Sequence, residues 1–245
     1  LDGADHSIDG TGPVDGLGVT EANAGVFVAD VPDERIENVT VRNLSATGWN
    51  AGLQVDTSGL GGPGDVRFEN ATLRQNEQGV SLRGTDATVT NLTATNNDVG
   101  VDLSTTGATS LTNLTLDDNR IGLAAVESSS VRLRSATVAN STDEGVLTSA
   151  FVAIAIEDTV VRNGSATGIR LQGDDGGTLS NVTVQNNSGA GVAVLSSTGT
   201  TTIASSNVSD NGGIGVRVAA DTPTRINDSV VGANAGGIDA SSNLT

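Results

Sequence analysis

The chain has 245 residues and a formal net charge of −17. Such acidity excludes ordinary nucleic-acid binding, which needs a basic surface, and it disfavours docking on anionic lipid. The chain has no cysteine and a single histidine, His6, so disulfides, thiolate metal sites and a histidine metal cluster within this chain are excluded.

The chain divides into an irregular beginning and a long regular part. Residues 1–34 are predicted to form an N-terminal segment with the first rung, and residues 35–245 a continuous run of regular repeats. Between residues 56 and 65 the chain is so rich in Gly that it predicts a loop, and residues 172–177 predict a second, shorter one. Because the repeat covers almost everything, we expect one elongated domain.

A glycine followed by alternating apolar residues marks each repeat, as in Gly100-Val-Asp-Leu. Neighbouring glycines of this series lie 21 to 27 residues apart. A period in the twenties with strand-type alternation is typical of a solenoid. The marker glycines are Gly25, Gly52, Gly79, Gly100, Gly122, Gly145, Gly168, Gly191, Gly215 and Gly237.

One repeat, residues 110–125, shows how a rung is built. Leu114 and Leu116 should point inward and Thr115 outward, because strand side chains alternate faces. Asn and Gly accept the left-handed backbone angles at which a strand turns a corner. The sequence therefore predicts an all-β, single-domain, right-handed parallel β-helix of about ten rungs, with a repeat of about 22–24 residues. A leucine-rich or helical repeat is disfavoured, because helix-length apolar patterns are missing.

Two columns of stacked side chains follow from this alignment. The inward column is predicted to begin with Val39 and Val41 and to continue through Ala71 and Leu73. Turn asparagines should form a second column, in which side-chain amides hydrogen-bond from rung to rung. Its predicted members are Asn76, Asn97, Asn119, Asn140, Asn163, Asn186 or Asn187, Asn211 and Asn234.

A family resemblance rests on Ile8-Asp-Gly-Thr-Gly12 and on the repeated Asn-Val-Thr-Val, Asn-Asn and Gly-Val-x-Leu units that follow. These resemble the NosD-like β-helix repeats over nearly the whole chain. That group belongs with carbohydrate-binding and sugar-hydrolase β-helix domains, including the pectate lyases. The resemblance implies the architecture and action on polysaccharides, but its recurring residues are structural and indicate no particular activity.

The charged residues carry a second resemblance. All twelve basic residues are arginine, and aromatic residues make up only 2% of the chain. This composition resembles that of surface proteins from extremely halophilic archaea, where surface carboxylates keep the protein hydrated in molar salt that screens their repulsion. An ordinary acidic secreted protein is the alternative. Both interpretations predict an extracellular or cell-surface location.

The resemblance directs the search for catalytic groups to acidic residues. Asp174-Asp175 is similar to the paired aspartates of polygalacturonase-type hydrolases, whose carboxylates serve as acid and base. The Asn-Thr-Asp, Gly-His-Gly and Arg-Ile-Lys elements of those enzymes are missing here. An acidic turn in a Gly-rich loop explains the pair equally well.

A calcium-assisted lyase would need clustered carboxylates and a basic proton acceptor. Alignment of the turns places Glu77, Asp98, Arg120 and Asp143 in one column, with Asp102 on an outward strand position nearby. The alternative is a surface ladder in which Arg120 offsets two carboxylates. Calcium held by Asp98 and Asp102 without any chemistry is favoured over a lyase.

Two further kinds of site are predicted. Trp49 precedes the 56–65 loop, where it either stacks on a sugar ring, with Asp56 and Asp65 as further ligand-binding candidates, or packs the loop down. The repeat also generates many Asn-x-Ser/Thr sequons. The glycosylation candidates are Asn38, Asn70, Asn91, Asn113 and Asn181.

Three functions fit the sequence. The leading hypothesis is a non-enzymatic β-helix domain that serves as a rigid spacer, adhesin or glycan-binding surface. The alternatives are a lyase or hydrolase of acidic polysaccharide, and a subunit that assembles end to end. The sequence shows neither a transmembrane run nor a signal peptide. Because it begins at Leu1 and stops within a repeat at Thr245, we expect a mature or excised piece of a longer protein, or a partner that covers the end.

Overall fold

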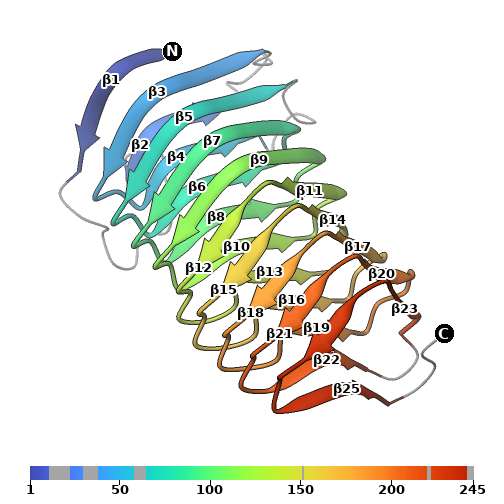
Figure 1. Ribbon diagram of the computed structural model, residues 1–245. Helices are drawn as coiled ribbons and strands as arrows, with labels where there is room; N and C mark the ends of the chain where they lie inside the picture. The colour runs from blue at the N-terminus through green and yellow to red at the C-terminus, as the bar shows by residue number, and fades with distance from the viewer. Residues whose placement is uncertain (11–22, 30–37, 58–64, 151, 220–221, 242–245) are drawn as a thin grey trace.

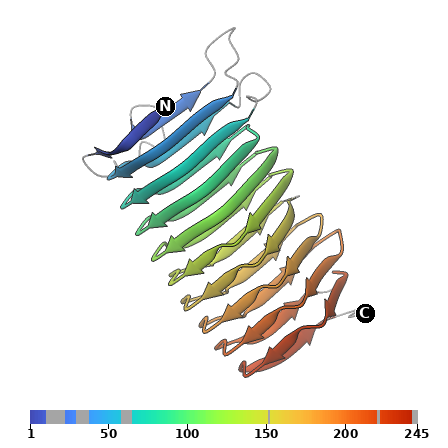
Figure 2. The same ribbon diagram turned by 45° about the horizontal axis from the view of Figure 1, so that its top comes forward.

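The computed structural model describes residues 1–10, 23–29, 38–57, 65–150, 152–219 and 222–241. Within these ranges every extended element is a strand, and none of them is a helix long and apolar enough to cross a membrane. The strands wind into two parallel sheets whose successive rungs lie side by side along one axis (Figures 1 and 2). The predicted all-β solenoid is confirmed.

The smaller sheet has ten strands, and each marker glycine lies within one of them or directly before it. Ten strands in line correspond to about nine turns of the solenoid, close to the ten rungs predicted. In order along the sheet they are β2 (Ala24–Ala29), β4 (Ala51–Asp56), β6 (Gln78–Arg83), β8 (Val99–Ser104), β10 (Ile121–Val126), β13 (Val146–Ser149), β16 (Ile169–Gln172), β19 (Val192–Leu195), β22 (Ile214–Val218) and β25 (Gly236–Ala240).

The larger sheet has fifteen strands, long in the first rungs and divided in the later ones. The long strands are β1 (Asp2–Asp9), β3 (Val39–Thr47), β5 (Val66–Arg74), β7 (Ala87–Thr95) and β9 (Ala108–Asp117). The divided ones are β11 (Ser130–Arg134) with β12 (Thr137–Ala139), β14 (Ala153–Glu157) with β15 (Val160–Arg162), β17 (Gly177–Ser180) with β18 (Thr183–Gln185), β20 (Thr201–Ala204) with β21 (Asn207–Ser209), and β23 (Thr224–Asn227) with β24 (Val230–Gly232).

A corner residue bends every rung of the larger sheet into two arms. Asn43, Asn70, Asn91 and Asn113 have φ between 54° and 57°, the left-handed region that Asn tolerates better than most residues. Their exposed amides form a ladder, in which each Nδ2 donates to the Oδ1 of the preceding rung at 2.7–3.0 Å. We call the residues before this corner the first arm and those after it the second arm. With the smaller sheet they give each rung three sides.

The core lies between these three sides. Leu73, Leu92 and Leu116 from the second arm and Leu103 and Leu123 from the smaller sheet are at most 1% exposed. The predicted start of the inward column is wrong, because Val39 and Val41 belong to the first arm and pair with Val66 and Phe68. Both arms carry the same apolar alternation, so periodicity alone does not tell which arm a pair belongs to.

The turn asparagines form a buried ladder in two runs. Asn97 Oδ1 accepts hydrogen bonds from both the backbone nitrogen and Nδ2 of Asn76, at 3.0 and 3.2 Å. The two runs are Asn76–Asn97–Asn119 and Asn187–Asn211–Asn234. The prediction is wrong for Asn140 and Asn163, which lie one residue earlier in the turn with positive φ, so that Ser141 and Gly164 occupy the ladder positions.

The marker glycines are needed because successive rungs approach closely at this point. A Cβ on Gly100 would lie 2.6 Å from the carbonyl oxygen of Gly122 in the next rung, and one on Gly79 would lie 2.5 Å from that of Gly100. Backbone atoms held in a parallel sheet cannot move aside for one side chain. The number of residues between successive marker glycines therefore gives the number of residues in one rung.

Gly100→Ala should lower the free energy of unfolding by about 1–3 kcal/mol, because the added methyl group overpacks the contact between rungs. Chemical denaturation measures this change. Gly237→Ala is the matched control, since Gly237 belongs to the same series but has no atom within 4 Å of its added Cβ. Equal stability of the two variants would contradict the steric explanation.

Candidate functional site

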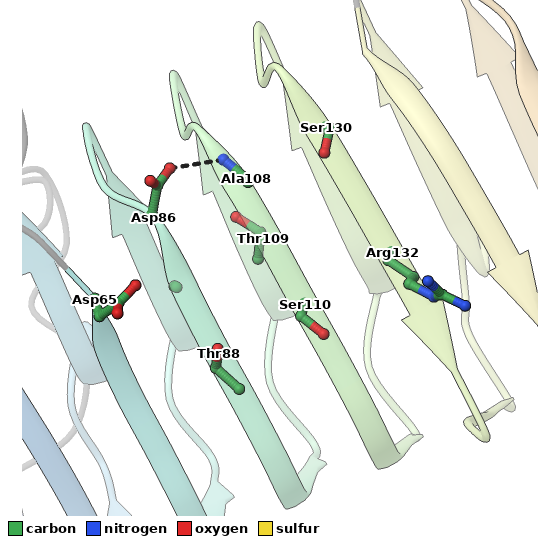
Figure 3. A pocket seen from close by; sticks show the side chains of 9 residues that line it. Asp65, Asp86, Thr88, Ala108, Thr109, Ser110, Ser130 and Arg132 are labelled. Atoms are coloured by element: carbon green, nitrogen blue, oxygen red, sulfur yellow. Dashed lines mark hydrogen bonds between the residues drawn. The ribbon is translucent and has the colours of Figure 1, made fainter.

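The outer surface of the first arm contains two adjoining cavities, of about 270 and 450 Å³. They share Ser130 and Arg132 of β11 (Figure 3 shows the smaller cavity), so we treat them as one groove that runs across the strands β7, β9, β11, β14 and β17. Its lining residues are Asp65, Asp86, Ala87, Thr88, Ala108, Thr109, Ser110, Ser130, Val131, Arg132, Ala153, Ile154, Ala155, Asp175, Gly176, Gly177, Thr178 and Thr200.

The groove is hollow because its floor carries small side chains. Ser130 pairs with Ala108 on one side and Ala153 on the other, and all three are exposed. In the next outward row, Thr88 pairs with Ser110 and Ser110 with Arg132. Parallel strands lie about 4.8 Å apart, so these polar groups repeat at that interval along the groove. Hydroxyl groups both donate and accept hydrogen bonds.

Carboxylates lie at both ends of the groove. Asp86 Oδ1 accepts a hydrogen bond from the backbone nitrogen of Ala108 at 2.7 Å, and the exposed Asp65 lies one rung away (Figure 3). At the other end, Asp175 Oδ1 accepts a hydrogen bond from Thr198 Oγ1 at 3.2 Å. The sequence candidates Asp65 and Asp175 therefore line the same groove.

Arg132 supplies the positive charge of the groove lining. Its Nη2 lies 2.8 Å from Glu157 Oε2, and its side chain is 55% exposed. The groove thus offers donors and acceptors along a line of rungs. This groove was not predictable from sequence, because short hydroxyl and methyl side chains on one arm form no recognisable motif.

Trp49, a ligand-binding candidate, holds the N-terminal strand. Its indole Nε1 donates to the carbonyl oxygen of Ile8 in β1 at 3.1 Å, and a Cβ on Gly10 would lie 2.8 Å from the ring. The half-buried ring also packs against the core. Asp56 ends β4 and is the strand partner of Arg83. Most of the loop after it, residues 58–64, lies outside the described residues, so sugar binding there stays a prediction.

Asp98, Arg120 and Asp143 do form the predicted column. Arg120 Nε lies 2.6 Å from Asp98 Oδ1, and its Nη1 lies 3.0 Å from Asp143 Oδ2. The hydrogen bond that Arg120 donates to Asp98 is the main cause that raises the pKa of Arg120. Glu77, the fourth member, instead accepts a hydrogen bond from Asn50 Nδ2. At 43–46% exposure each pair contributes at most about 1 kcal/mol, which suits the surface-ladder interpretation.

Asp102 lies on the outer face of β8. Its Oδ2 accepts a hydrogen bond from Gln78 Nε2 at 3.1 Å. Burial raises the pKa of Asp102, while the charge of Arg83 opposes this shift. Over the ranges that the structure describes, no three His, Asp or Glu side chains gather closely enough to hold a metal ion. Calcium binding by Asp98 and Asp102 stays a prediction.

Asp174 and Asp175 face opposite sides of the chain. Asp174 is fully buried, and its Oδ2 accepts a hydrogen bond from Thr148 Oγ1 at 2.7 Å, whereas Oδ1 has no partner. Burial raises the pKa of Asp174 to about 6, opposed by the hydrogen bond from Thr148 and reinforced by the charge of Asp175. The two carboxylates therefore do not face a common substrate. The column of buried hydroxyl residues at this corner, which includes Thr106 and Ser197, is the sequence signal that reveals the inward position.

The glycosylation candidates occupy two kinds of position. Asn70, Asn91 and Asn113 belong to the exposed corner ladder, and Asn181 Nδ2 donates to Asp158 Oδ1 at 2.8 Å. Asn38 is exposed, with a φ of 56°. Glycosylation at each of them stays a prediction.

The buried Asp174 should make stability depend on pH. The unfolded chain releases this proton near pH 3.8 but the folded chain only near pH 6, so folding carries an ionisation cost that appears as the pH rises through this window. About two pKa units correspond to about 3 kcal/mol. Because the unfolded carboxyl is already more than half ionised at pH 4, about 2 kcal/mol of this cost falls between pH 4 and 7.5, and Asp174→Asn should lose that much less unfolding free energy than the wild type.

Urea denaturation at both pH values measures this difference. The control is Asp175→Asn, because Asp175 is the exposed neighbour and its removal should leave most of the pH dependence in place. The same pH dependence in wild type and Asp174→Asn would show that the buried carboxyl carries no ionisation cost.

Comparison with known proteins agrees with the β-helix fold described above. A family model described as "Right handed beta helix region" matches residues 51–208 and 99–245. A search of curated proteins finds no match.

Two solved structures from Azotobacter vinelandii are similar in fold. The A-module of the mannuronan C-5 epimerase AlgE4 has a TM-score of 0.62 and 13% identity, covering 90% of this chain and 77% of that one. The AlgE6 A-module has a TM-score of 0.57 and 13% identity, covering 86% of this chain and 76% of that one. At this identity the likeness concerns the fold alone.

Proposed function

We propose, from the premise that the chain belongs to the right-handed β-helix family, that it is a non-enzymatic polysaccharide-binding module on the outside of the cell. The observation that carries this proposal is the groove of the first arm. It crosses several rungs, so it suits a linear ligand, and it presents hydroxyl and carboxylate groups at the interval of the strands. Sugars are recognised by such hydrogen-bonding groups.

Composition supports the proposed location. The net charge of −17 without any lysine suits a protein that stays soluble in molar salt, as at the surface of a halophile. There the partner would be a polysaccharide, a surface glycan or another surface protein. Association with further copies is a second expectation, which rests on the exposed apolar side chains of Val230 and Ile238 on β24 and β25.

A binding experiment tests the module. Calorimetric titration with a panel of neutral and acidic polysaccharides should detect at least one ligand. Ser130→Leu should weaken its binding by roughly tenfold or more, about 1.4 kcal/mol, because Ser130 lines both cavities and leucine fills the floor without offering a hydrogen bond. Thr137→Leu, on β12 of the second arm, is the control and should bind like the wild type. Absence of binding across the panel would refute the proposal.

A polysaccharide-modifying enzyme is the second candidate, and Asp102 favours it. A carboxyl whose pKa is raised by burial on an outer strand face is the kind of group that works as a general acid or base. The mannuronan C-5 epimerase modules have a similar fold, so this architecture is compatible with a carbohydrate-modifying site. New reducing ends, unsaturated uronate or inverted sugar units, lost in Asp102→Asn, would favour the enzyme over the binding module.

A further inference from the structure

The charges that line the groove are unevenly distributed. Asp65, Asp86 and Asp175 contribute three carboxylates. Arg132 is the single cation among the described lining residues, and Glu157 already lies 2.8 Å from its guanidinium. The neighbouring Arg67 lies 3.9 Å from Asp65, so it too faces an acidic partner. The groove therefore offers a ligand no positive charge that lacks an acidic neighbour.

This charge distribution disfavours the binding of a chain of uronic acids. Each sugar unit would bring a carboxylate toward a surface whose negative charges outnumber its positive ones, and like charges brought together across an interface disfavour binding. The whole protein adds to the repulsion, with its net charge of −17.

The same groups favour the binding of neutral sugars, because they can form hydrogen bonds with sugar hydroxyl groups. An ionised carboxylate only accepts hydrogen bonds, and its bonds from hydroxyl groups are among the stronger ones in proteins. Asp86 uses Oδ1 for the backbone nitrogen of Ala108, and Asp175 uses Oδ1 for Thr198. Each keeps its second oxygen available for a sugar hydroxyl. Thr88, Ser110 and Ser130 supply donors between the two ends.

We propose that the groove selects neutral, hydroxyl-rich polysaccharides and rejects polyuronates. This inference rests on the proposed binding function and names its ligand class. This ligand class differs from the acidic polysaccharide that the sequence predicted for the lyase or hydrolase alternative. It also differs from the mannuronan named in the similar structures.

Matched ligand pairs test the selection. Oligosaccharides of mannan and polymannuronate, and of glucan and polyglucuronate, chosen with the same glycosidic linkage, differ within each pair mainly by the carboxyl group at C6. In 0.1 M salt, the neutral member of the pair that binds should bind at least roughly tenfold more tightly, about 1.4 kcal/mol. In 1 M salt the ratio should shrink, because the screening length falls from about 10 Å to about 3 Å.

The double variant Asp65→Asn/Asp86→Asn should raise polyuronate affinity and reduce the ratio severalfold, while the amide oxygens still accept hydrogen bonds. Asp239→Asn is the matched control, because Asp239 is similarly exposed, at 59%, but lies on β25 of the smaller sheet. A polyuronate that binds as well as its neutral partner would overturn the selection and leave the binding function standing. Failure of every oligosaccharide to bind would overturn both.

Discussion

In the part of the chain that the structure describes, side chains take their positions from the stacking of one rung on the next. A single rung has no core of its own, and its backbone groups find partners only in the rungs above and below. The marker glycines allow the backbones to approach at this point, and the turn asparagines satisfy backbone nitrogen atoms where the strands end. Stability is therefore a sum over neighbouring interfaces, which is why a chain with only 2% aromatic residues can fold.

The same stacking creates the candidate site. An outward residue contributes little alone, but its counterparts on adjacent strands turn it into a row. Ser130 with Ala108 and Ala153 becomes a floor, and Thr88 with Ser110 becomes a line of hydroxyl groups. The groove thus needs no long loop, and its length follows from the number of rungs that keep small side chains at these positions.

Sequence was a good guide wherever a feature repeats. The glycine series, the alternation of Leu114 and Leu116, and the column of Asp98 with Arg120 were all predictable, because each is fixed by the period. Features that depend on which side of the rung a residue occupies were not. Val39 was placed on the wrong arm, and Asn140 was placed one residue from its true turn position.

The candidate site was harder to predict for a related reason. Asp174 follows Gly173, whose φ of 69° turns the chain, so Asp174 faces inward and Asp175 outward. The dipeptide Asp-Asp alone does not show that the two side chains face opposite sides of the chain. The groove joins residues from at least five strands, each chemically ordinary, so no local pattern announces it.

The interruption of the buried asparagine ladder changes how two successive rungs are joined. At Ser141 the ladder stops, and the hydroxyl of this residue is buried without a partner. In the same rung the long strands of the larger sheet give way to divided ones, β11 and β12. Asn140, one residue earlier, donates its Nδ2 to Asp117 Oδ1 of the preceding rung at 2.8 Å, and β12 keeps its parallel pairing with β9. The rungs therefore stay joined where the buried ladder stops, because an adjacent position takes over the amide hydrogen bond in a rung that the groove also crosses.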